Sequence, residues 1–527
     1  MSPTPEPCNL ATHFVDRNVA EGRGDRTALL EGNSACSYAS LAARVNQIGN
    51  ALLELGVRPQ DRVLLALADS VDFVATWYAA QKIGAVTAEV YTFLQPKDYT
   101  YYVDYTGASV VVVDGVTLER MRVATETTRS HPILLVLGAR GEQLRAREIS
   151  FETLVERQHS TLEPAETTVD TIALWKFTTG STGKPKACVH RTRSPMVSYD
   201  GYARGVLDIR ADDIVLPVPK LFFGYARDLA ALFPFGVGGA GLIFRERTTA
   251  ELIFELIARH RPTILVNVPT MMQAMLDHPS ARDQDLSCLR LCTSAGEALP
   301  EPLHHRWNDT FGVEVLDGIG SSEAYHIYIS NQPGRLRPGS IGEVVPGYDV
   351  TIVDDDDQPV PDGTIGRLWI RGDSAALEYW EDPDATERTF ATDLVMSGDL
   401  AERDSDGFFL YRGRADDLLK VGGIYVAPAE IERCLATHPD VVECAVVAAD
   451  RDGLARSCAW VVIRSGTTST PDALQAFVRE RLAPHKVPRE VRFVSSLPRT
   501  GSGKIDRTAL RDAAIATPAG GQGGTAG

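Results

Sequence analysis

The residues from Thr178 to Lys186, with the sequence TTGSTGKPK, have the composition of a loop that can hold a polyphosphate. Backbone amides and hydroxyls of a small, polar stretch can donate hydrogen bonds to phosphate oxygens, and its two lysines can balance their charge. The stretch differs from the usual P-loop, because only two residues separate Gly180 from Gly183 and Pro185 follows Lys184. A flexible surface turn could have the same composition, so the rest of the chain has to decide between the two.

Five further blocks of small and charged residues follow in order. They are SAGE at Ser294–Glu297, DGIGSSE at Asp317–Glu323, SGDL at Ser397–Leu400, GRADDLLKVGGIYVAPAEIE at Gly413–Glu432, and PRTGSGKIDR at Pro498–Arg507. This series resembles the adenylate-forming superfamily of acyl-CoA synthetases, nonribosomal peptide adenylation domains and luciferases, and most closely its benzoate-CoA ligase branch. The resemblance covers nearly the whole chain.

Composition limits the classes of protein and of partner. A chain of 527 residues is too long for one ordinary core, and 44% hydrophobic with 23% charged residues is typical of a globular protein. The formal charge of −17 argues against nucleic acid and anionic membranes as partners, because the mean field repels polyanions. ATP would therefore need a local positive pocket.

The cysteines and the N-terminus predict a cytoplasmic protein. Eight cysteines are scattered without a CxxC pair or zinc-like spacing, which indicates buried thiols in a reducing compartment. The start, MSPTPEPCNL, has no basic region followed by an apolar core, so no secretory signal is predicted. No apolar run reaches the length of a bilayer span.

The hydrophobic pattern predicts an α/β fold. Apolar residues recur at three- and four-residue steps from Tyr38 to Leu55 and from Val71 to Ile83, which predicts two helices. Short apolar runs predict buried strands, and their alternation with helical stretches favours largely parallel sheets. These runs are Val63–Leu67, Val86–Val90, Val110–Val113, Ile133–Leu137, Ile264–Val268 and Leu289–Cys292.

We predict two domains and a tail. Residues 1–415 form a large domain with mostly parallel sheets flanked by helices, and a β-rich subdomain begins near Val350. Residues 416–514 form a small, mobile α+β lid with strands at Val441–Val447 and Ala459–Ile463 and a helix from Pro471 to Leu482. Residues 515–527 are too poor in apolar residues to pack and are predicted to be disordered.

The resemblance implies an ATP site. The residues that match it are Thr178, Thr179, Gly180, Ser181, Thr182, Gly183, Lys184, Lys186, Gly296, Glu297, Asp317, Gly318, Ser322, Asp399 and Arg414. By resemblance the first eight hold the β- and γ-phosphates, Gly296, Asp317 and Gly318 line the adenine, and Asp399 accepts the ribose hydroxyls. Without the resemblance, Asp399 could equally be a turn residue beside Gly398.

The resemblance also implies a metal site, a catalytic lysine and a moving lid. Glu323 matches the Mg²⁺-binding carboxylate, a ligand type that suits a hard divalent ion. Lys504 matches the lysine that reaches the acid and the α-phosphate during adenylation. Asp416 matches the hinge about which the lid rotates, and Gly422 and Gly423 match the lining of the thiol tunnel.

The acid pocket resembles that of benzoate-activating enzymes. Residues matched to it or close beside it are Phe222, Tyr225, Arg227, Asp228, Ala295, Gly320 and His326. Aromatic and glycine residues suit a flat aryl ring, and His326 could meet the carboxylate by hydrogen bond or by charge. Arg227 and Asp228 depart from the small or neutral residues of benzoate ligases. They either pair on a surface helix or point inward, which would favour a hydroxy- or amino-substituted acid.

The resemblance therefore implies an AMP-forming aryl acid:CoA ligase with ATP, Mg²⁺ and CoA, acting on a substituted benzoate or cinnamate. A carboxylate is a poor electrophile, and conversion into an acyl-adenylate overcomes this by positioning and charge stabilisation. Three alternatives stay open: transfer to a carrier-protein thiol, an ATP-dependent diazotase that activates nitrite against an aryl amine, and an inactive nucleotide-binding regulator. Relatives occur as monomers or homodimers, and the sequence does not choose between them.

Overall fold

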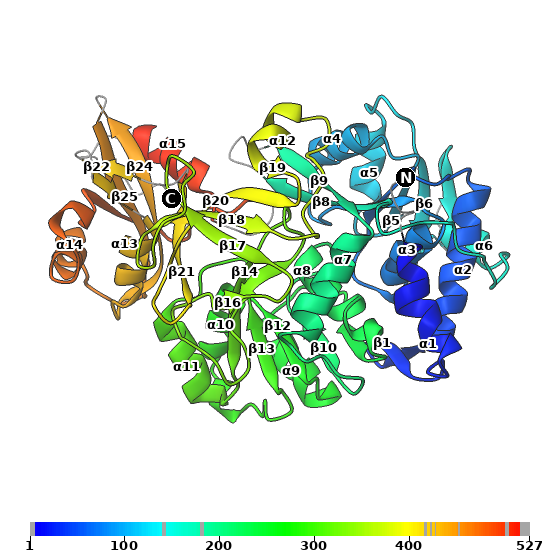
Figure 1. Cartoon of the computed structure of the whole chain (residues 1–527), viewed down its shortest axis with the longest axis horizontal. Coiled ribbons are helices and arrows are strands. Elements are labelled where there is room, and N and C mark those ends of the chain that lie inside the picture. Colours follow the sequence, from blue (N-terminus) through cyan, green and yellow to red (C-terminus); the bar gives the residue numbers. More distant parts are fainter. Residues whose placement is uncertain are drawn as a thin grey trace. The chain divides into compact units, whose positions relative to one another are not determined.

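The computed structural model describes residues 6–139, 144–179, 184–415, 419–421, 424–426, 428–451, 454–500 and 505–516 (Figure 1). The chain divides into two compact units. The first comprises Met1–Leu299, Leu303–Val350 and Ile370–Met396, and the second comprises Pro300–Pro302, Thr351–Trp369 and Ser397–Gly527.

The first sheet of the first unit carries the strand that leads into the TTGSTGKPK stretch. Its order is β7-β6-β5-β3-β4-β8-β9, with all neighbours parallel except the antiparallel pair β8 and β9. The strands are β3 (Arg62–Ala66), β4 (Val86–Glu89), β5 (Val110–Asp114), β6 (Ile133–Leu137), β7 (Glu148–Ser150), β8 (Ile172–Thr179) and β9 (Pro185–Arg191).

The second sheet has a parallel centre and antiparallel edges. Its order is β16-β15-β14-β13-β12-β10-β11-β1-β2, and the run from β14 to β1 is parallel. The strands are β1 (Thr27–Glu31), β2 (Ser34–Ser37), β10 (Ile214–Pro217), β11 (Ala240–Ile243), β12 (Ile264–Asn267), β13 (Leu291–Ser294), β14 (Val315–Gly320), β15 (Ile327–Ser330) and β16 (Glu343–Val344).

Helices cover these sheets. Those before residue 397 are α1 (Arg17–Ala20), α2 (Tyr38–Glu54), α3 (Val71–Lys82), α4 (Pro96–Thr106), α5 (Leu118–Thr125), α6 (Phe151–Val155), α7 (Arg193–Ser198), α8 (Gly224–Ala231), α9 (Ala250–His260), α10 (Pro269–Leu276), α11 (Glu301–Phe311) and α12 (Pro383–Thr389). Ser37 caps α2 by accepting a hydrogen bond from the Ser40 amide, and Ser70 caps α3 from the Phe73 amide. The two predicted helices therefore begin where the sequence places a capping side chain.

Alternating side chains of β3 and β5 enter two different cores. Val63 and Leu65 pack in the cluster that contains α2 and α3, whereas Leu64 and Ala66 pack in the cluster that contains α4 and α5. A strand buried on both faces reads as a continuous apolar run, as these strands do in the sequence. Helices thus cover both faces of the first sheet.

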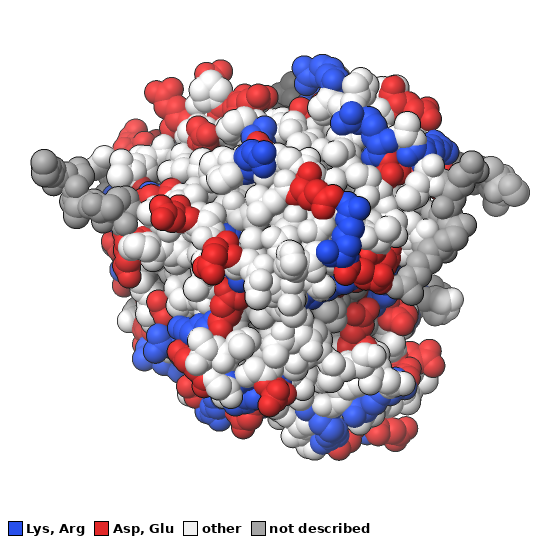
Figure 2. All heavy atoms as spheres, turned by 90° about the vertical axis from the view of Figure 1, so that its right-hand side faces the viewer, with Lys and Arg blue, Asp and Glu red and all other residues white. Residues whose placement is uncertain are grey.

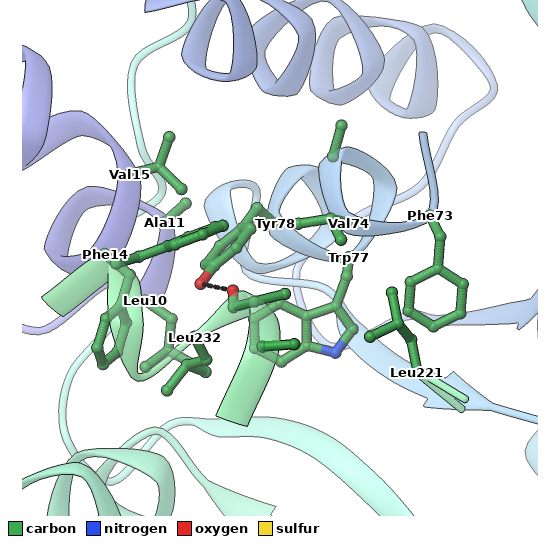
Figure 3. Packing of buried hydrophobic residues seen from close by; sticks show 14 of the residues in the cluster. Leu10, Ala11, Phe14, Val15, Phe73, Val74, Trp77, Tyr78, Leu221 and Leu232 are labelled. Atoms are coloured by element: carbon green, nitrogen blue, oxygen red, sulfur yellow. Dashed lines mark hydrogen bonds between the residues drawn. The ribbon is translucent and has the colours of Figure 1, made fainter. Parts of the chain in front are cut away.

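The larger of these cores joins the two sheets of the first unit. In Figure 3 Phe14, Tyr78 and Leu232 lie together, and the Tyr78 hydroxyl donates a hydrogen bond of 2.7 Å to the Ala231 carbonyl. Burial of one such side chain stabilises the folded state by about 1.5–3 kcal/mol. This core fixes α8, which carries several of the predicted site residues.

The second unit contains most residues of the smaller sheets, whereas β19 (Phe390–Ala391) belongs to the first unit. Their strands are β17 (Asp349–Val353), β18 (Gly366–Arg371), β19 (Phe390–Ala391), β20 (Leu394–Arg403), β21 (Phe409–Arg414), β22 (Leu419–Val421), β23 (Ile424–Val426), β24 (Val441–Arg451), β25 (Leu454–Ile463) and β26 (Glu490–Phe493). The order β17-β18-β20-β19, with β21 on β20, forms one sheet, and β24-β25-β26 forms another. Its helices are α13 (Pro428–Ala436), α14 (Pro471–Arg479) and α15 (Arg507–Ala516).

The fold class predicted from the sequence is confirmed as a mixed α/β protein with parallel-rich sheets, a β-rich part and a C-terminal α+β part. One boundary differs, because α15 continues to Ala516, two residues into the predicted tail. Leu510 and Ala514 anchor this helix by packing against Val447 of β24 and Cys458 of β25. Residues 517–527 of the predicted tail lie outside the described residues.

The surface is mixed in charge. On the face shown in Figure 2, acidic and basic side chains are interspersed among uncharged ones. In the described part of the chain, no helix combines the length and the apolar character that a bilayer crossing requires.

Candidate active site

The predicted phosphate loop joins β8 to β9. Thr178 and Thr179 end β8 and pair with Lys186 and Pro185 at the start of β9. Gly180, Ser181, Thr182 and Gly183 lie outside the described residues. Lys184 is exposed, and the Lys186 ammonium lies 2.9 Å from an Asp382 carboxylate oxygen.

The predicted adenine-binding residues follow two neighbouring parallel strands. Ser294 of β13 is in register with Asp317 of β14, so the segment Ala295–Glu297 and the end of β14 meet at one edge of the sheet. This edge is the carboxyl end of the parallel strands, where open α/β sheets bind ligands. Gly296 has φ +86°, a left-handed conformation that favours glycine, and Gly318 leaves no room for a side chain because a Cβ would lie 2.7 Å from the Ile329 carbonyl oxygen. Ala295 is buried, and the Glu297 carboxylate accepts a hydrogen bond of 3.2 Å from the Thr270 hydroxyl.

Asp317 is a buried carboxylic acid. Its side chain is 4% exposed, and its Oδ1 has no hydrogen-bond partner among the described residues. Burial raises the pKa of Asp317 to about 8, so the group is mostly protonated at neutral pH. A protonated carboxyl group can donate as well as accept a hydrogen bond.

The turn between β14 and β15 is held by its backbone carbonyls. The Ser322 carbonyl accepts from His190 Nε2 at 2.7 Å, and the Glu323 carbonyl accepts from the Ala376 amide at 2.8 Å. The next two carbonyls accept from side chains: Ala324 from the Ser374 hydroxyl at 2.8 Å, and Tyr325 from Lys176 Nζ at 2.6 Å. Four consecutive carbonyls thus have donors from β9, β8 and the segment that follows β18. We call residues 321–326 the anchored turn.

His190 supports the anchored turn as a neutral imidazole. Burial lowers the pKa of His190 to about 3. Because a carbonyl only accepts, Nε2 carries the proton that bonds Ser322, and Nδ1 accepts from the Ser194 hydroxyl at 3.2 Å. Ser322 was predicted from the sequence as an ATP-binding residue, and the described contacts engage its carbonyl in fixing the turn.

Glu323 presents one carboxylate oxygen for a ligand. Its Oε1 accepts a hydrogen bond of 2.7 Å from the Tyr379 hydroxyl, and its Oε2 has no hydrogen-bond partner in the described part of the chain. No group of three or more His, Cys, Asp or Glu side chains with metal-site geometry occurs among those residues. A single carboxylate fits Mg²⁺, which binds through few protein ligands when phosphates supply the others.

His326 lies among aromatic rings. Its ring centroid is 5.5 Å from that of Tyr202, 5.7 Å from that of Tyr225 and 5.0 Å from that of Phe233. Both imidazole nitrogens are buried and lack hydrogen-bond partners among the described residues. Burial lowers the pKa of His326 to about 3, so of the two predicted modes of contact with an acid the neutral hydrogen bond is favoured over charge. Gly320 allows this turn, because a Cβ there would lie 2.5 Å from the His326 carbonyl oxygen.

Phe222 belongs to a different aromatic cluster from His326. Its ring packs against Tyr91, Phe93 and Phe223 at centroid distances of 5.2, 5.8 and 4.8 Å. Tyr225, three residues later, instead shares a hydrogen bond of 2.6 Å with the Thr293 hydroxyl of β13. The stretch Lys220–Tyr225 therefore contributes residues to two aromatic clusters. Tyr225 belongs to the cluster around His326.

Arg227 and Asp228 are buried, so the prediction that they form a surface pair is wrong. Their side chains are 3% and 0% exposed. Arg227 pairs with Asp228 at 2.8 Å and with Glu89 of β4 at 2.7 Å, and Asp228 pairs with Lys176 of β8 at 2.9 Å. The inward orientation is correct, but each charge is neutralised by another side chain of the protein.

Asp399 and Arg414 face one another across two strands of the second unit. They are direct partners in the β20 and β21 register, and Arg414 Nη1 lies 3.5 Å from Asp399 Oδ1. Asp399 lies inside β20, so the alternative of a turn residue is excluded. The Arg414 side chain is 50% exposed.

Four further predicted site residues, Asp416, Gly422, Gly423 and Lys504, lie outside the described residues.

Two residues that contact the predicted site, Lys176 and Tyr379, were not predicted from the sequence. Lys176 stands inside the apolar strand sequence IALWKFTT, and a charge within a buried strand is a detectable signal that a partner lies nearby. Tyr379 has no such signal, because its contact with Glu323 depends on a fold that brings residues more than 50 positions apart together.

Two protein-family models match the chain. The model described as AMP-binding enzyme matches residues 16–380, and the model described as AMP-binding enzyme C-terminal domain matches residues 430–504. The chain therefore belongs to the AMP-binding enzyme family, and the resemblance found in the sequence is confirmed.

Relatives within this family narrow the class to aryl acid:CoA ligases. The benzoate–CoA ligase of Thauera aromatica is 39% identical over 97% of both chains. The crystal structure of a benzoate CoA ligase from Burkholderia xenovorans LB400 has a TM-score of 0.88 at 36% identity and covers 96% of this chain and 100% of that one. The anthranilate CoA ligase AuaEII in complex with anthranoyl-AMP has a TM-score of 0.91 at 34% identity and covers 98% of both.

Proposed function

We propose that this protein is an AMP-forming aryl acid:CoA ligase that activates benzoate or a small substituted benzoate. The carboxylate attacks the α-phosphate of ATP, pyrophosphate leaves, and the resulting acyl-adenylate then reacts with the thiol of CoA to give the thioester and AMP. The observation that carries the choice of acid is His326, a neutral, buried imidazole among Tyr202, Tyr225 and Phe233 whose nitrogens have no hydrogen-bond partner among the described residues. Similarity to benzoate and anthranilate ligases supports the same class of acid.

In the first half-reaction the protein positions two anions against one another. The aromatic rings around His326 would hold the aryl ring, and the imidazole would hydrogen-bond the carboxylate without adding a charge that weakens its nucleophilicity. The β8–β9 connection and Lys186 would hold the outer phosphates, and the end of β14 would face the adenine. Glu323 would hold Mg²⁺, which when bound neutralises phosphate charge as pyrophosphate departs.

The second half-reaction needs a different arrangement of the C-terminal part. We propose a domain boundary at residue 416 with Asp416 as the hinge, Lys504 as the adenylation lysine, and Gly422 and Gly423 beside the thiol. The free state of all eight cysteines supports a reducing, cytoplasmic setting for a CoA-dependent enzyme.

The diazotase alternative loses the observation that favoured it. That alternative depended on Arg227 and Asp228 facing a polar substrate group, and both are paired with other protein side chains. We therefore retain the ligase over the diazotase.

Pyrophosphate release from ATP, measured with a panel of aryl acids in the presence and absence of CoA or nitrite, tests the proposal. We expect release with an aryl acid alone and thioester formation once CoA is added. Release that requires nitrite, or products of ADP and phosphate, would overturn it.

The Lys504→Ala variant separates the two half-reactions. Loss of a cation that stabilises developing phosphate charge lowers the rate of adenylation by about 10²–10³-fold. Thiolysis of a preformed acyl-adenylate should keep most of its rate, and equal loss of both steps would contradict the assignment of Lys504.

A further inference from the structure

A buried network of four charges lies behind His326. Lys176 of β8, Asp228 and Arg227 of α8, and Glu89 of β4 are joined in series by ion pairs of 2.9, 2.8 and 2.7 Å. Each of these side chains is at most 7% exposed. Two positive and two negative groups balance, as the cost of burying charge requires.

Both carboxylate oxygens of Asp228 accept hydrogen bonds inside the network. Asp228 Oδ1 accepts from Arg227 Nε and Nη2, and Asp228 Oδ2 accepts from Lys176. The Arg227 guanidinium stacks over Trp77 at 4.9 Å, beside a cavity of about 10 Å³ that has room for no more than one water molecule. An aryl acid therefore cannot bind on that side of Arg227.

Lys176 connects this network to the anchored turn. Its Nζ donates to the Tyr325 carbonyl at 2.6 Å and lies 3.5 Å from the centroid of the Tyr325 ring. Tyr325 has φ +78°, a left-handed conformation that is costly for a bulky residue and persists only where the surroundings enforce it. The next residue is His326.

A glycine makes room for the Lys176 ammonium. A Cβ on Gly224, the first residue of α8, would lie 2.6 Å from Lys176 Nζ and 2.7 Å from its Cε. Gly224 has an ordinary negative φ, so its lack of a side chain serves this close approach and not a special backbone conformation.

We propose that Lys176, held by Asp228, is a positioning residue for the aryl-acid site: it fixes the backbone of Tyr325 and thereby the place of the His326 imidazole. Lys176 lies on β8, two residues before Thr178, the first residue of the predicted phosphate loop. Arg227 and Glu89 balance the charge of the pair and do not contact the acid. The inference rests on the proposed function for the identity of the acid, but not for the contact itself.

Kinetics of Lys176→Met test the proposal against a matched control. Lys82 is also buried, with a side chain 4% exposed and an ion pair of 2.8 Å to Asp16, but it lies on α3 away from the anchored turn. We expect K176M to raise the KM for the aryl acid by about tenfold, the effect of losing one charge-assisted hydrogen bond, with the KM for ATP nearly unchanged. We expect K82M to lower the melting temperature and to leave both KM values unchanged. A K176M enzyme that is less stable but has the wild-type KM for the acid would overturn the proposal.

Gly224→Ala displaces the ammonium without removing it. We expect G224A to raise the KM for the acid as K176M does, and the double variant K176M/G224A to lose no more than K176M, because the displaced contact is already absent. Additive losses would contradict a shared role.

Crystal structures of the ligand-free variants test the positioning role of Lys176 without depending on the identity of the acid. We expect the Tyr325–His326 backbone to shift in K176M and to stay in place in K82M. If no aryl acid is turned over by the wild-type protein, the proposed function fails, while the crystallographic comparison still decides whether Lys176 positions His326. An unmoved turn in K176M would refute the positioning role.

Discussion

The buried network around Lys176 and the Asp399–Arg414 pair differ in burial and in the distance between opposite charges. Behind His326, Lys176 and Asp228 are buried and 2.9 Å apart, and both carboxylate oxygens of Asp228 accept hydrogen bonds from Lys176 or Arg227. Across β20 and β21, Arg414 is half-exposed and 3.5 Å from Asp399. A buried, closely paired charge can shape a site but cannot also bind a ligand. In the longer pair, the half-exposed Arg414 side chain can move away and leave Asp399 to bind a ligand.

Removal of one charge from the buried network should have the largest effect. Asp228→Asn leaves Lys176 and Arg227 without their shared anion, and a broken buried pair typically costs about 3–5 kcal/mol. Urea unfolding should show this loss. Asp170→Asn, at a partly exposed carboxylate that pairs with Arg191 and Arg193, serves as the control and should cost less than about 1 kcal/mol. Similar losses in both variants would remove the distinction between the two kinds of region.

At the Asp399–Arg414 pair the effect should fall on ligand binding. On the proposed assignment of Asp399 to the ribose hydroxyls, Asp399→Asn should weaken two hydrogen bonds and raise the KM for ATP by about a hundredfold, with little change in unfolding free energy. Glu402→Gln is the matched control, because Glu402 pairs with Arg412 across the same two strands at 3.0 Å. A large loss of stability in D399N with an unchanged KM for ATP would assign Asp399 to structure alone.

His326 provides a third case, because it is buried like the network but its nitrogens have no hydrogen-bond partner among the described residues. His326→Phe keeps an aromatic ring and removes the hydrogen bond, so the KM for the aryl acid should rise by about tenfold at constant KM for ATP. Since burial lowers the pKa of His326 to about 3, the wild-type KM for the acid should show no inflection from this residue between pH 5 and 8. His278→Gln, at a histidine packed against Phe254, should leave both values unchanged.

Asp317 tests a separate quantity, the dependence of stability on pH. Its pKa is raised from 3.8 to about 8, so between these values the folded state binds more protons and the free energy of unfolding falls as pH rises. Asp317→Asn removes this titrating group, so the unfolding free energy of the variant should fall less steeply between pH 5 and 8.

Asp285 provides the control of opposite sign. Hydrogen bonds from Ser287 and Arg261 lower the pKa of Asp285 to about 2, so D285N should leave the slope between pH 5 and 8 unchanged. A D317N slope equal to that of the wild type would mean that Asp317 is ionised in the folded protein.

The elements of the first unit were predictable because each has a local signal. The helix expected at Tyr38–Leu55 is Tyr38–Glu54, and the strand expected at Ile133–Leu137 has those bounds. Apolar spacing together with a capping serine is sufficient for such elements. The family and its order of motifs were likewise evident from residues close together in sequence.

The contacts that make the site specific were not predictable from the sequence. The two charges at Arg227 and Asp228 were visible in the sequence. Their partners, Glu89 and Lys176, lie 52 or more positions away, in strands β4 and β8. The segregation of Phe222 from Tyr225 depends on how α8 begins, which spacing alone does not reveal. Pairings of this kind follow from the sheet order, and short motifs carry no information about it.

The anchored turn also indicates how the acid preference of this protein could be redesigned. Because a separate donor holds each of four successive carbonyls, from Ser322 to Tyr325, an inserted or deleted residue would break several of these contacts together. Mutant libraries should therefore keep the loop length constant and vary only the rings that surround the imidazole, at Tyr202, Tyr225 and Phe233. Acceptance of a new acid would then depend on side-chain volume within an unchanged frame.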